Sequence, residues 1–75
     1  MVATPSVRQM TVEKIRRRVE RIELEKQNEE LAHTMEDALW LDVLRAIAHN
    51  RCDDPRACAE AAAITENIAF NRHFA

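Results

Sequence analysis

The 75-residue sequence contains no glycine and only two prolines, and its aromatic residues are Trp40, Phe70 and Phe74. Glycine supplies the positive φ angles and close backbone approach that hairpin turns, phosphate-binding loops and dinucleotide-binding motifs need. Its absence excludes P-loop, Rossmann and most all-β architectures. Apolar residues make up 47% of the chain and charged residues 32%, a balance typical of a globular protein. We therefore expect a small all-α protein.

Long apolar runs are also absent. Residues 1–10 lack the apolar stretch of a secretory signal, and no run of about 18 apolar residues could span a membrane. We therefore expect a cytoplasmic protein with no membrane partner, in which Cys52 and Cys58 stay mostly reduced. A core this small rarely supplies more than about 3–5 kcal/mol, so such chains usually need a disulfide, a metal or a second copy. A homodimer is the expectation that follows.

The sequence predicts a flexible tail over residues 1–10 and one helical domain over residues 11–75. Thr11 is a credible N-cap, and an amphipathic apolar stripe follows it. The stripe consists of Val12, Ile15, Val19 and Ile22. A second stripe begins at Leu24, two residues out of register, which rotates the apolar face by about 200°. Residues 25–30 are therefore expected to cross solvent or change neighbours, and a single long coiled coil is disfavoured.

Residues 38–48 are apolar on nearly every side, and only Asp42 and Arg45 interrupt them. A helix with so narrow a polar stripe must be covered by several neighbours, which we expect to include a second subunit. Asp37 lies three residues after Thr34 and an apolar run follows it, a pattern similar to a capping box. A break near His33–Thr34 is therefore one alternative and an unbroken helix is the other.

The end of the chain carries the strongest local signals. Asn50 suits a left-handed helix end, and Asp54-Pro55 is typical of a helix start. The last helix is predicted from Pro55 to about Asn71, with an apolar stripe formed by Ala57, Ala61, Ile64 and Ile68. The predicted fold is therefore all-α, with two to three helices in a helical hairpin that is completed as an antiparallel helical dimer.

Charge is unevenly distributed along the chain. Residues 8–21 carry a net charge of +4, whereas residues 22–42 carry −6. The candidate binding residues in the basic segment are Arg16, Arg17, Arg18 and Arg21. They could form a solvated or intersubunit face, bind an acidic protein surface, or lie along nucleic-acid phosphates. Because no aromatic residue interleaves them and the chain is acidic overall, nucleic acid is the alternative partner rather than the leading one.

The remaining candidate chemistry is sparse. His49, Cys52, Cys58 and His73 could offer metal ligands, but five residues separate the cysteines and a structural zinc site favours a closer pair. Core packing of the thiols is the favoured hypothesis, with a Cys52–Cys58 bridge and a metal site as alternatives. No cofactor is expected. The only serine lies in the tail, and no catalytic set of residues is evident, so we expect no enzyme activity.

Trp40, Phe70 and Phe74 are either core residues or a partner-binding patch, because tryptophan is enriched among interface hot spots. The sequence therefore predicts a small cytoplasmic protein-binding adaptor, chaperone or inhibitor that acts through helical surfaces as a homo-oligomer. The alternative is a nucleic-acid-associated transcriptional regulator that uses the basic first helix.

Overall fold

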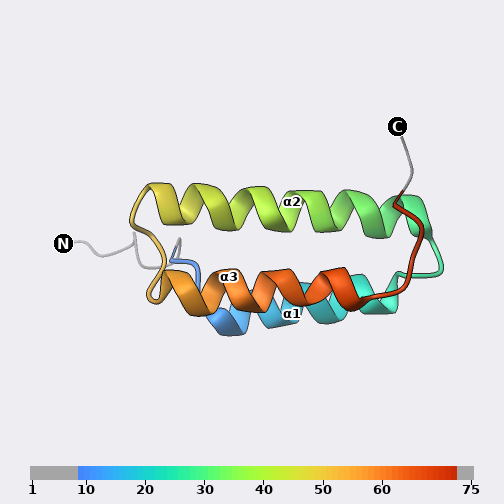
Figure 1. Cartoon of the computed structure of the whole chain (residues 1–75), viewed down its shortest axis with the longest axis horizontal. Coiled ribbons are helices and arrows are strands. Elements are labelled where there is room, and N and C mark those ends of the chain that lie inside the picture. Colours follow the sequence, from blue (N-terminus) through green and yellow to red (C-terminus); the bar gives the residue numbers. More distant parts are fainter. Residues whose placement is uncertain (1–8, 73–75) are drawn as a thin grey trace.

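A computed structural model of the chain describes residues 9–72, and every regular element in that range is helical (Figure 1). The elements are α1 (Val12–Leu24), α2 (Glu29–Ala48), α3 (Pro55–Ala63) and a short 3₁₀ helix, η2 (Ile64–Asn67). The all-α prediction is confirmed, with three α-helices. No helix in the described range is long and apolar enough to cross a membrane.

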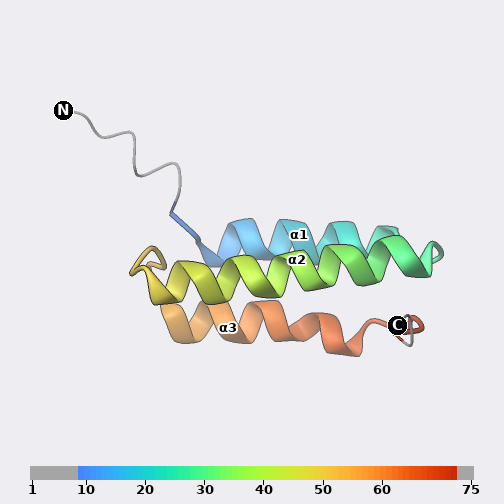
Figure 2. The ribbon, with the colours of Figure 1, turned by 90° about the horizontal axis from the view of Figure 1, so that it is seen from above.

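The three helices form a bundle in which each packs against both others. α1 and α3 run in the same direction and α2 runs opposite to them (Figure 1). Seen from above, α2 lies over the space between α1 and α3 (Figure 2). The side of α2 that faces away from α1 and α3 therefore has no other described element against it.

The change of apolar face predicted near residues 25–30 is a break between two helices. α1 ends at Leu24 after a start capped by Thr11, whose hydroxyl accepts a hydrogen bond from the Lys14 N–H at 3.2 Å. Asn28 caps α2 by accepting from the Leu31 N–H at 3.3 Å. α2 then continues through Thr34, whose hydroxyl donates to the Glu30 carbonyl at 3.0 Å, so there is no break near His33–Thr34.

The connection from α2 to α3 follows the sequence signals. Asn50 has a φ of 57°, in the left-handed region predicted for it. The Asp54 carboxylate accepts a hydrogen bond from the Ala57 N–H at 3.1 Å, with Pro55 at the first helical position. Met10, assigned to the tail, donates its N–H to the Arg51 carbonyl at 2.7 Å, whereas residues 1–8 lie outside the described part of the chain.

The last helix is shorter than predicted. Its α-helical part ends at Ala63, η2 adds one turn, and the backbone is extended at Ile68. The predicted apolar stripe is also wrong in one place, since Ile64 is 50% exposed whereas Thr65 is fully buried. The Thr65 hydroxyl donates to the Ala62 carbonyl at 3.1 Å. A side chain that bonds the backbone of the preceding turn competes with the regular helical pattern, and this accounts for the tighter turn here.

The core lies on the axis between the three helices. Its buried side chains come from all three α-helices and from Ile68, which follows η2, and they are mostly aliphatic or small. The cluster comprises Ile15, Ile22, Ala32, Leu39, Val43, Cys58, Ala61, Ala62 and Ile68. The small residues on α3 allow close approach of its backbone to α1 and α2, and the larger apolar residues of α2 remain free to line a surface groove.

Candidate partner-binding surfaces

A groove of about 320 Å³ lies between α2 and α3. Its lining is mostly apolar, with small residues along α3 and large ones along α2. The lining residues are Trp40, Val43, Leu44, Ile47, Ala59, Ala62, Ala63 and Glu66. A concave apolar surface with one acidic residue is suited to an apolar side chain carried on a partner helix.

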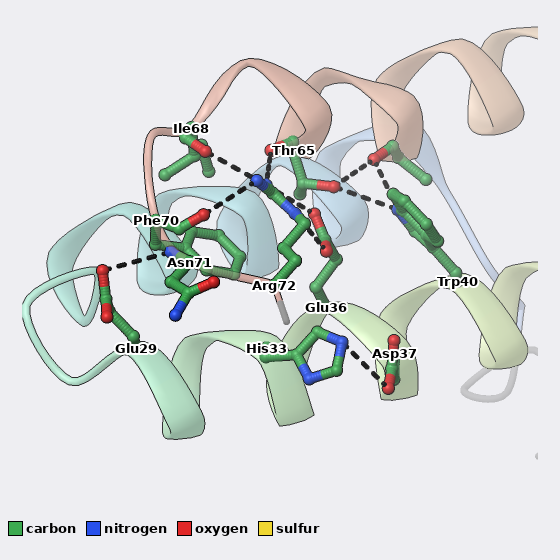
Figure 3. Close-up of polar contacts among 11 residues, drawn as sticks. Glu29, His33, Glu36, Asp37, Trp40, Thr65, Ile68, Phe70, Asn71 and Arg72 are labelled. Carbon is green, nitrogen blue, oxygen red and sulfur yellow. Dashed lines mark hydrogen bonds and ion pairs between the residues drawn. The ribbon is translucent and has the colours of Figure 1, made fainter. Parts of the chain in front are cut away.

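Trp40 is held in place at this groove. Its indole N–H donates to the Ala62 carbonyl and to the Thr65 hydroxyl, each at 3.0 Å (Figure 3). The residue remains 37% exposed. Trp40 therefore both braces α2 against α3 and presents part of its ring to the groove, which combines the two roles considered from the sequence.

Large apolar side chains continue along α2 from the groove toward its outward face. Leu44, which lines the groove, is 64% exposed, and Leu41 is 46% exposed. Such residues are common singly on protein surfaces, but a cluster beside an apolar groove is typical of an interaction site. The sequence indicated this surplus of apolar surface on residues 38–48, without showing which side of the helix would carry it.

The arginines of α1 do not form one continuous charged surface. Arg18 reaches across to α2, where its guanidinium lies 2.8 Å from the Asp42 carboxylate. Arg17 pairs with Glu13 one turn earlier at 3.1 Å, with both side chains largely exposed. Arg16 and Arg21 are exposed and form no ion pair within residues 9–72. The predicted basic site is therefore partly neutralised within the fold.

The most buried charge in the described chain was missed by the sequence analysis. Glu36 is 1% exposed, and Arg72 grips its carboxylate through Nε at 2.9 Å and Nη2 at 3.0 Å (Figure 3). The same guanidinium donates to the carbonyls of Thr65 at 2.7 Å and Ile68 at 3.0 Å. The hydrogen bond to Glu36 raises the pKa of Arg72, so its guanidinium stays charged in this partly buried position. This arrangement fastens the C-terminal segment to α2.

Of the two phenylalanines predicted as binding residues, the structure describes only Phe70. Phe70 is partly buried against the core, and the Arg72 guanidinium lies 3.8 Å from the centre of its ring. Arg72 and Glu36 lie between Phe70 and Trp40 (Figure 3), so these two aromatics do not share a patch. Phe74 lies outside the described residues.

The sequence did contain a signal for the burial of Glu36, since this residue falls in register with the buried positions Ala32, Leu39 and Val43 of α2.

Cys58 is fully buried, and both cysteines carry free thiols. Burial, together with the neighbouring Cys52, raises the pKa of the Cys58 thiol from 9.0 to about 11. A thiol of this kind is neutral at ordinary pH and packs as a small apolar group. Within residues 9–72 there is no group of three or more His, Cys, Asp and Glu side chains placed to hold a metal ion, and His73 lies outside that range.

No protein-family model, curated protein or solved structure matches this chain. Its function is therefore argued from the surfaces described above.

Proposed function

We propose that this chain is a non-enzymatic protein-binding module, an adaptor, chaperone or inhibitor, that works as a homo-oligomer in the cytoplasm. The observation that carries this proposal is the apolar groove between α2 and α3, whose lining includes the exposed side chain of Leu44. The two free thiols are in keeping with a reducing compartment.

The groove supports binding of an amphipathic helix. The small side chains of Ala59 and Ala63 on α3 leave space that an apolar anchor residue of the partner can fill. Trp40, already fixed by its indole hydrogen bonds, provides a rigid wall and loses little conformational freedom when the anchor binds. Glu66 at the groove would favour a partner helix with a basic residue near its anchor.

The test fills the groove without disturbing the core. Ala63→Phe places a ring in the groove, whereas Ala69→Phe places the same ring at an exposed position that does not line it. Proteins retained by the tagged wild-type chain in extracts of its host would be identified, purified and titrated against all three chains. We expect Ala63→Phe to raise the dissociation constant at least about tenfold, or about 1.4 kcal/mol, and Ala69→Phe to leave it unchanged. Equal affinity for all three chains would rule out the groove as the binding site.

The basic face of α1 remains a second proposed contact. Arg17 and Arg21 lie one turn apart and both are exposed, so they could grip one acidic patch of a partner. Reversing both charges should leave helix content and oligomeric state unchanged while weakening capture of the same partner. Retention of full affinity would place binding entirely on the groove.

The alternative function, nucleic-acid-associated regulation, rests on the same arginines. It has less support than protein binding, because Arg18 is already paired with Asp42 and Arg17 with Glu13. Titration of duplex DNA at two salt concentrations tests it, since phosphate contacts lose affinity steeply as salt rises. We expect no binding at either concentration; salt-sensitive binding would favour the alternative.

A further inference from the structure

The outward face of α2 is centred on a leucine. The buried residues of this helix are Ala32, Glu36, Leu39, Val43 and Ala46. At about 100° per residue, the position opposite the middle of that set is Leu41. Leu41 is 46% exposed, and Figure 1 shows no other described element on that side of α2. The helix therefore presents an apolar residue at the point furthest from its own core.

Exposed residues on this face recur at intervals of three, four and seven. They are Thr34, Asp37, Ala38, Leu41, Leu44, Arg45 and Ala48. Spacing of this kind forms a narrow seam along one side of a helix and is the pattern through which two helices pack side by side. We call these seven residues the α2 seam.

The α2 seam is symmetric about Leu41. Asp37 and Arg45 lie four residues to either side of it, so an acid on one side corresponds to a base on the other. Ala38 and Leu44 lie three residues to either side, so a small side chain corresponds to a large one. A surface whose halves are complementary in charge and size is complementary to itself after a two-fold rotation.

We propose that the α2 seam is the interface of a homodimer, in which two α2 helices pack antiparallel across a two-fold axis at Leu41. Asp37 then faces the partner's Arg45, and the same ion pair recurs on the other side of the axis. Ala38 makes room for the partner's Leu44. The proposal rests on the homo-oligomer of the proposed function and assigns it a face, a direction and a register.

The charges favour the antiparallel direction. In a parallel dimer in register, Asp37 would meet the partner's Asp37 and Arg45 the partner's Arg45, so both contacts would be repulsive. Neither side chain has a strong competing contact in the described chain. Arg45 forms no ion pair there, and the Asp37 carboxylate lies a long 3.7 Å from the His33 imidazole. Both charges are thus available to a second copy.

The dimer also leaves the α2–α3 groove accessible. The groove lies on the flank of α2 that faces α3, and of its lining residues only Leu44 belongs to the seam. The two-fold axis that exchanges two antiparallel helices is perpendicular to both, so the α3 flanks of the two chains stay on the same side. The two grooves therefore lie along one edge of the dimer, where each keeps most of its lining exposed.

Charge reversal tests this register. Asp37→Arg gives each chain two bases at the paired positions, and Arg45→Asp gives each chain two acids. Each variant replaces both attractive contacts with repulsive ones, so we expect its dimer dissociation constant to rise at least about tenfold. An equimolar mixture of the two variants should form a heterodimer, and the double variant should dimerise like the wild type. Sedimentation at several concentrations measures all four samples.

The matched controls are Glu60→Arg and Arg56→Asp. These two exposed residues are also four positions apart, but they lie on α3 away from the seam. Their reversal should leave the dimer unchanged. If the wild type is a dimer that Asp37→Arg and Arg45→Asp do not weaken, the interface is elsewhere; the homo-oligomer stands and the α2 seam is overturned. If the wild type remains a monomer at about 100 μM, its association is weaker than about 5.5 kcal/mol, and both the homo-oligomer and the α2 seam are overturned. The groove would still be tested by its own variants.

Cross-linking adds a readout independent of charge. Leu41→Cys, made together with Cys52→Ser, places one exposed thiol in each chain at the two-fold axis, while Cys58 remains buried. We expect oxidation to convert most of the protein into a disulfide-linked dimer that keeps its helix content. Leu24→Cys in the same background puts the thiol at the 74% exposed end of α1 and should give little linked dimer. Equal linking at both positions, or none at the Leu41 position, would count against the proposed axis.

Discussion

Each face of α2 carries an exception to the usual pattern of an amphipathic helix, a buried charge on one and exposed leucines on the other. The inward face contains Glu36, which is 1% exposed, whereas the outward face exposes Leu41 and Leu44. The buried carboxylate has its partner within the same chain, because Arg72 pairs with both of its oxygens. The outward leucines have no covering element among the described residues. The buried charge of Glu36 is therefore compensated within one chain, whereas the exposed leucines would be covered by a second chain, as proposed above.

The largest expected effect comes from removing the partner of Glu36. Arg72→Ala leaves a buried carboxylate without a counter-charge, and breaking a buried pair in this way costs about 3–5 kcal/mol. We expect the free energy of unfolding, measured by urea titration and circular dichroism, to fall by most of its value in so small a domain.

Removing both partners provides the control for this change. Glu36→Met combined with Arg72→Leu eliminates both charges, and replacement of a buried ion pair by apolar residues is often neutral or stabilising. The double variant should therefore be more stable than Arg72→Ala alone. If the two are equally unstable, the contribution of Arg72 lies in its packing against Phe70 or in its bonds to carbonyl groups.

The second prediction compares leucines on the two faces of α2. Leu39 is fully buried, so Leu39→Ala should lower the free energy of unfolding by about 2–5 kcal/mol through lost burial and a residual cavity. Leu44 is 64% exposed, so Leu44→Ala should change the stability of the monomer by less than about 0.5 kcal/mol. The comparison requires dilute protein, because above the dimer dissociation constant Leu44→Ala also weakens association. Equal losses in dilute samples would contradict the exposure assigned to Leu44.

Cys58 can be compared with Glu36, because it is also a buried ionisable group but has no opposite charge as a partner. Its folded pKa of about 11 lies above the ordinary value of 9.0, so the folded state holds the thiol proton more tightly than the unfolded state. The stability that this provides is complete below about pH 9 and is lost as the pH rises through 11, to a limit on the order of 2–3 kcal/mol. Over this range the wild type should lose more stability than Cys58→Ala. Parallel pH curves for the two chains would refute the assignment.

A modest effect is expected at Trp40, which lies between the two faces. Trp40→Phe removes the indole N–H that bonds Ala62 and Thr65, whereas the Thr65 hydroxyl keeps its own bond to the Ala62 carbonyl. We expect a loss of about 0.5–1.5 kcal/mol, the usual net contribution of such a bond. A loss above 3 kcal/mol, the roughly upper limit for leaving a buried group unpaired, would show that the ring contributes mainly through packing.

Local features of the fold were predictable because local chemistry determines them. The caps at Thr11 and Asp54 and the left-handed Asn50 each depend on one residue and its neighbours. The signals were weaker at residues 25–28, where no proline or glycine marks the break and Asn28 supplies the cap. Periodicity alone identified the surplus apolar surface of residues 38–48, but not its division between a groove and an outward seam.

The features that were missed depend on distant parts of the chain. Glu36 and Arg72 are 36 residues apart, and neither has a neighbour in sequence that indicates the other. The early end of α3 is connected to the same pair, since Arg72 also bonds the carbonyls of Thr65 and Ile68 where the chain leaves the helix. Local apolar spacing could extend the predicted helix past Ala63, but it could not reveal the contact with Arg72 at the point where the backbone changes direction.

The Glu36–Arg72 pair also bears on how cooperatively the protein unfolds. Helices α1, α2 and α3 alone would bury Glu36 with its charge uncompensated, because its partner lies in the segment after η2. Closing of the bundle is therefore coupled to docking of residues 68–72 onto α2. We expect that segment to unfold together with the helices in a single transition and not to detach first.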